Sequence, residues 1–70
     1  MDKQEILLSK KLLYSYKERL ENEIINRSSK LRIPPKISQE IIQNNSEINQ
    51  LENILRRLEK KTSISSNEEG

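Results

Sequence analysis

Apolar positions along this chain predict two long amphipathic helices separated by one break. Between residues 4 and 30 they recur at helical spacing, and neither Gly nor Pro interrupts them. This first stripe consists of Ile6, Leu13, Tyr16, Leu20, Ile24 and Leu31. After the break the spacing is a strict 4-3-4-3-4-3-4, typical of coiled-coil-like packing. The positions of this second stripe are Ile37, Ile41, Asn44, Ile48, Leu51, Leu55, Leu58 and Thr62.

Two consecutive prolines, Pro34 and Pro35, mark the break. Pro34 disfavours a helical conformation at Ile33, and a Pro–Pro pair does not fit inside a helix. Pro35 can occupy the first turn of the next helix, or Ser38 can be its N-cap. We therefore predict helix one at about 4–30, a turn at about 31–36 and helix two at about 37–61. Two helices of equal length joined by a short turn predict an all-α fold, an antiparallel two-helix hairpin.

The continuity of helix two through residues 44–46 stays open. The segment Gln-Asn-Asn-Ser is poor in helix formers, and Ser46 followed by Glu47 can cap a third helix. We predict a continuous or kinked helix, with a split into a short three-helix arrangement as the alternative. Asn44 either sets the register of a helix pair or lies at the kink. Residues 63–70 show no period and are predicted to be a disordered tail, so the hairpin domain covers residues 1–62.

Two helices alone cannot enclose a core, because each buries one stripe and leaves its outer flank uncovered. We therefore expect a small non-enzymatic protein–protein interaction module, such as an adaptor, an assembly subunit or an inhibitor. The partner is a protein, with a homodimer favoured. The predicted partner-binding residues are Ile37, Ile41, Ile48, Leu51, Leu55, Leu58, Leu8 and Leu12.

Composition argues against most enzyme chemistry. The chain has no Cys and no His, so a disulfide, a zinc finger, a thiol nucleophile and an imidazole base are excluded. Its one Gly is residue 70, which excludes a glycine-rich phosphate loop. We expect no metal and no cofactor. No apolar run exceeds three residues, so a membrane span and a signal-peptide core are not expected, and the expected location is the cytoplasm.

Charge gives only weak support for nucleic-acid binding. Thirteen Lys and Arg against eleven acids leave a net charge of +2. In an antiparallel hairpin the end of helix two lies beside the start of helix one, which predicts a basic patch there. Its residues are Lys10, Lys11, Arg56, Arg57, Lys60 and Lys61. Tyr14 and Tyr16 lie near lysines and can stack on bases, but packing explains them better. A weak nucleic-acid-binding helical protein is the third alternative for function.

Two stretches of helix two resemble a motif of a known family. Small helical-hairpin phosphatases of sporulation response regulators carry Ser-Gln-Glu-Leu-Asp at the start of their second helix. Ser38-Gln39-Glu40-Ile41-Ile42 matches its first three residues, and Asn45-Ser46-Glu47-Ile48-Asn49 keeps the Glu with Asn49 in place of Asp. Hydrolysis of a partner's phospho-aspartate needs only a carboxylate or amide that positions water. In this alternative the resemblance implies Glu47 and Asn49 as the catalytic residues.

Overall fold

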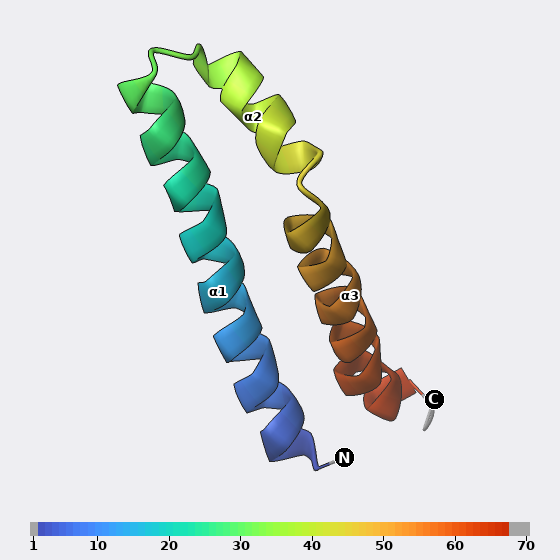
Figure 1. The fold of residues 1–70 in the computed structure, drawn as a ribbon. Coiled ribbons are helices and arrows are strands. Elements are labelled where there is room, and N and C mark those ends of the chain that lie inside the picture. Colours follow the sequence, from blue (N-terminus) through green and yellow to red (C-terminus); the bar gives the residue numbers. More distant parts are fainter. Residues whose placement is uncertain (1, 68–70) are drawn as a thin grey trace.

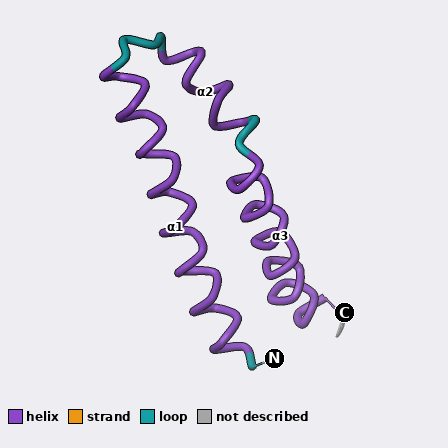
Figure 2. Tube along the Cα trace, viewed as in Figure 1, coloured by secondary structure: helices purple, strands orange, loops and turns teal. Residues whose placement is uncertain are grey.

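Three helices form an antiparallel hairpin in the computed structural model, which describes residues 2–67 and the side chains of residues 2–61. They are α1 (Lys3–Lys30), α2 (Pro35–Gln43) and α3 (Ser46–Asn67). Helix α1 forms one arm, α2 and α3 return along it as the other arm, and both termini lie at the same end (Figure 1). Helices and short loops account for all the described residues (Figure 2). The predicted all-α, hairpin-like fold is confirmed.

The turn between the two arms is built by a Schellman-type helix ending. The backbone N–H of Ile33 donates to the carbonyl of Ser28 at 2.8 Å, and the N–H of Arg32 donates to Ser29 at 3.0 Å. This pair of bonds requires a left-handed residue directly after the C-cap, and Arg32 takes it with φ of 61°. Glycine adopts this conformation without the steric penalty that Arg32 bears.

The second arm is split into two helices. Helix α2 begins at Pro35 as a first-turn residue, one of the two predicted alternatives. Ser38 lies inside α2 instead of capping it, and its hydroxyl donates to the carbonyl of Pro35 at 2.9 Å. Helix α2 ends at Gln43 and α3 begins at Ser46. The favoured prediction of one continuous or kinked helix is therefore wrong, and the three-helix alternative is confirmed.

Asparagine side chains explain the split, because they satisfy backbone groups locally. The amide of Asn44 donates to the carbonyl of Glu40 at 2.9 Å, at the end of α2. The side-chain oxygen of Asn45 accepts the backbone N–H of Ile48 at 2.9 Å, which makes Asn45 the N-cap of α3. The cap is thus one residue earlier than the predicted Ser46. Asn44 lies at the break, as one of its two predicted roles requires.

The core lies along the contact between the two arms, where α1 packs against both α2 and α3. Its buried apolar side chains are Ile6, Ile42, Ile48, Leu51, Leu55 and Leu58. On α3 the buried residues follow the predicted seven-residue repeat. On α2 they do not, because Ser38 and Ile42 are buried while Ile37 and Ile41 are exposed. The break has turned α2 by one residue position, about 100°, relative to a continuous repeat.

The hairpin is a single layer of helices. Its principal dimensions are 51 × 19 × 15 Å, and an α-helix with side chains is about 10–12 Å wide. The 15 Å dimension is too small for two helices of this width, so the hairpin is one helix deep, and its two arms lie side by side (Figure 1). Neither broad face of this layer is covered by another element of the described chain.

The end of α3 differs from the predicted boundary. Its helical backbone continues to Asn67, past the predicted end near residue 61 and into the segment assigned to a tail. Residues 68–70 of that predicted tail lie outside the described residues.

Candidate functional site

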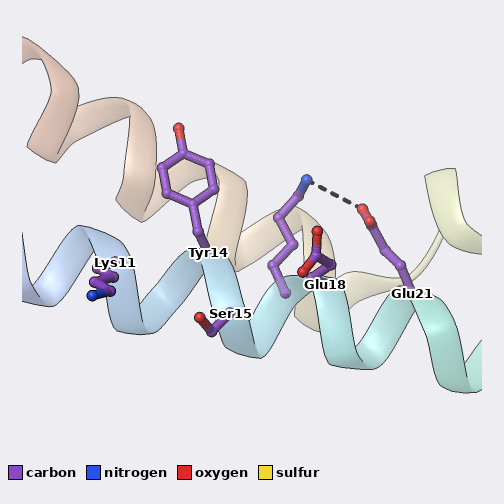
Figure 3. Close-up of a pocket in the computed structure, with 6 residues that line it drawn as sticks. Lys11, Tyr14, Ser15, Glu18 and Glu21 are labelled. Carbon is purple, nitrogen blue, oxygen red and sulfur yellow. Dashed lines mark ion pairs between the residues drawn. The ribbon is translucent and has the colours of Figure 1, made fainter.

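One broad face of the hairpin is crossed by ion pairs. The ammonium of Lys10 lies 2.7 Å from the carboxylate of Glu59, and that of Lys17 lies 3.6 Å from Glu52. Lys17 also pairs with Glu21 on its own helix at 3.1 Å (Figure 3, dashed line). The two lysines are seven residues apart, as are Glu52 and Glu59, so each pair projects from the same side of its helix. We call this surface the ion-pair face.

The lysines of the ion-pair face are partly shielded from water. Their side chains keep only 16% (Lys10) and 21% (Lys17) of their exposure. The hydrogen bond from Lys17 to Glu21 raises the pKa of Lys17 above its ordinary value of 10.5, and the charges of Glu21 and Glu52 act in the same direction, while burial opposes them. Partly exposed pairs of this kind stabilise a fold by less than about 1 kcal/mol each. Their main effect is to make this face polar.

A hydrogen bond joins the two arms on the opposite face. The hydroxyl of Tyr16 donates to the carboxylate of Glu47 at 2.6 Å, although the residues are 31 positions apart. This bond, followed by the negative charge of Glu47, raises the pKa of Tyr16 above its ordinary value of 10.0. At about 100° per residue, Tyr16 lies some 120° from Lys10 around α1, and Glu47 lies some 120° from Glu59 around α3. The two bridges therefore lie on opposite broad faces.

Exposed apolar side chains gather on the face that holds the Tyr16–Glu47 bond. Ile37, Ile41 and Ile54 each directly precede a buried residue, as Glu47 precedes Ile48. Helices α2 and α3 run in the same direction, so a residue one position before a buried one lies on the same side of either helix. The three isoleucines therefore lie on the same side of the second arm as Glu47. Leu12 lies one helical turn before Tyr16 on α1. We call this surface the apolar face; its residues are Leu12, Tyr16, Ile37, Ile41 and Ile54, and all five are exposed.

The predicted partner-binding residues separate into two groups. One group, Ile48, Leu51, Leu55 and Leu58, is buried in the hairpin's own core. The other group, Ile37, Ile41, Leu8 and Leu12, is exposed. Tyr16 and Ile54 were absent from the predicted set. Ile54 directly precedes Leu55, which belongs to the predicted seven-residue repeat. An apolar residue next to that repeat indicates that the apolar surface of the helix extends beyond the repeat.

The predicted basic residues lie at several places on the two arms. Lys10 is engaged by Glu59 on the ion-pair face. Lys11 lies on α1, where it lines an open depression with Tyr14; the same depression includes Lys17 and Glu21, so it borders the ion-pair face (Figure 3). Lys61 is exposed near the end of the described side chains. A depression on the outer surface of α3 brings together the remaining three with Asn53, namely Arg56, Arg57 and Lys60.

The residues implied by the phosphatase resemblance are not brought together. Glu47 and Asn49 are two positions apart on α3, so they project about 200° from one another. Each already has a structural partner: Glu47 accepts the hydroxyl of Tyr16, and the amide of Asn49 donates to the carbonyl of Gln43 at 3.2 Å. Within residues 2–67, no group of three or more acidic, His or Cys side chains is placed to hold a metal ion.

These features define a small all-helical hairpin with one uncovered apolar face. The chain belongs to the family described as Domain of unknown function (DUF8630), which matches residues 4–67. No curated protein and no solved structure matches the chain. Across the part of the chain that the structure describes, every helix falls short of the length and apolarity that crossing a membrane requires.

Proposed function

We propose that this chain is a small, cytoplasmic, non-enzymatic protein–protein interaction module that works by helix-on-helix packing. Its partner is a second copy of itself, and two hairpins together make a four-helix bundle. The single observation that carries this proposal is the one-layer shape of 51 × 19 × 15 Å. Stable domains place at least two layers of secondary structure around a shared core, and this hairpin supplies one.

The distribution of apolar side chains supports the same function. Ten large apolar residues of the described chain remain exposed, against six that are buried. Fully burying an Ile or Leu side chain is worth about 1.5–3 kcal/mol. A chain of 70 residues has only a small free energy of unfolding on its own. Burying the exposed apolar side chains against a second copy would therefore add a large share of the total stability.

Sedimentation equilibrium of the full chain between about 1 and 100 µM tests the proposal. We expect a mass near 16.6 kDa, twice the 8.3 kDa of one chain, and a melting temperature that rises with concentration. A compact helical monomer whose sharp melt does not depend on concentration would overturn the proposal.

A further inference from the structure

We infer that the apolar face is the surface that the second copy covers, through an isologous contact in which each hairpin uses the same residues. This inference rests on the proposed self-association and adds which of the two broad faces is the interface. Two single-layer hairpins stacked on this face form two layers, with Tyr16, Ile41 and Ile54 of each copy between them.

The dimensions of the face match what a stable dimer needs. The rectangle of 51 by 19 Å that encloses one broad face has an area of about 970 Å². Specific interfaces bury about 800 Å² on each partner, so one broad face is large enough without further elements. A second copy offers a face of the same length and the same apolar stripe. The net charge of +2 on each chain opposes pairing only weakly.

Polar groups distinguish the two faces. Covering the ion-pair face would remove water from two ammonium and three carboxylate groups, whose mutual attraction does not reliably compensate for lost hydration. On the apolar face the Tyr16 hydroxyl already donates to Glu47 at 2.6 Å, so covering this pair leaves no orphaned donor, and the charged group of the pair that loses water is the Glu47 carboxylate. Glu23 and Arg27 border this face on α1; they have opposite charges at i,i+4 spacing and remain exposed, as suits a polar rim.

Two matched double variants test the choice of face. Ile41→Gln with Ile54→Gln changes the apolar face, at residues that are 41% and 39% exposed. Leu7→Gln with Ile25→Gln changes the flank of the ion-pair face, because both residues lie about 60° from Lys10 around α1 and on the side away from Tyr16; they are 47% and 42% exposed. We expect the first variant to raise the dimer dissociation constant by roughly tenfold or more, and the second by less than about threefold. Circular dichroism checks that both remain helical.

A second measurement does not depend on how well those variants fold. Because the chain has no Cys, a single Ile54→Cys or Ile25→Cys substitution gives one thiol for a maleimide probe. Cys at position 54 should be protected at high concentration and should become reactive on dilution, whereas Cys at position 25 should react at every concentration. The reverse pattern, or a control double variant that weakens the dimer as much as the first, would overturn the inference and leave the proposed function standing. A monomeric unmutated chain would overturn both.

Discussion

Ile48→Ala is the change that tests the core most directly. Ile48 is 1% exposed, the most buried apolar side chain described, and it lies on the first turns of α3 against α1. Removing a buried Ile down to Ala destabilises a fold by about 2–5 kcal/mol, through lost burial and the cavity left behind. A chain of 70 residues has a total stability of about 3.5–10 kcal/mol at the usual stability per residue. We therefore expect Ile48→Ala to remove about a fifth of the stability or more.

Urea denaturation followed by circular dichroism measures this loss. The matched control is Ile25→Ala, the same chemical change at a residue that is 42% exposed and outside both the core and the apolar face. It should cost less than about 1 kcal/mol, because little apolar area is returned to water. Equal losses for the two variants would refute the assignment of Ile48 to the core and of Ile25 to the surface.

Three further predictions concern the turn, a titration and the chemistry. Arg32→Gly should raise the free energy of unfolding by up to about 1 kcal/mol in urea denaturation, because it relieves the left-handed residue; a destabilised variant would contradict that backbone assignment. The raised pKa of Tyr16 means that the folded state holds the phenol proton more tightly, so this stabilisation is present below pH 10.0 and declines as pH rises above it; the raised pKa of Lys17 acts in the same direction. Melting temperatures from pH 8 to 11 should therefore fall less steeply for Tyr16→Phe than for the control Tyr14→Phe, and parallel curves would count against the bond to Glu47. Finally, the protein should not accelerate phosphate release from a receiver-domain phospho-aspartate beyond spontaneous hydrolysis, and any acceleration that Asn49→Ala abolishes would restore the phosphatase alternative.

Periodicity predicted much of this fold because it reports directly on burial along one helix. The repeat through Ile48, Leu51 and Leu55 was sufficient to identify the buried side of α3, and the Pro34–Pro35 pair was sufficient to place the turn. The same repeat misassigned α2. A seven-residue pattern assumes an uninterrupted helix. The two-residue joint between α2 and α3 changes which side of α2 faces α1, while the spacing of apolar residues in the sequence stays the same.

The candidate site was harder to predict, because it depends on which residues of the two arms lie opposite each other. The Tyr16–Glu47 bond joins residues 31 positions apart. Their meeting depends on the geometry of the 31–34 turn and of the joint between α2 and α3, and neither can be obtained from single-helix periodicity. Tyr16 was assigned to the core stripe because its spacing fits, yet its ring lies at the edge of that stripe, where the hydroxyl can reach a carboxylate.

The joint at Asn44 and Asn45 constrains how this family can change its length. Because the conformation of this joint sets how α2 is rotated relative to α3, a residue added or removed there would change that rotation. Such a rotation changes which side chains of α2 face α1 and which face the partner. Ile42 could then leave the core and Ile41 could leave the apolar face. Substitutions that keep an N-capping side chain at position 45 leave this rotation unchanged. Related sequences should therefore tolerate different residues at the joint far more readily than a different number of them.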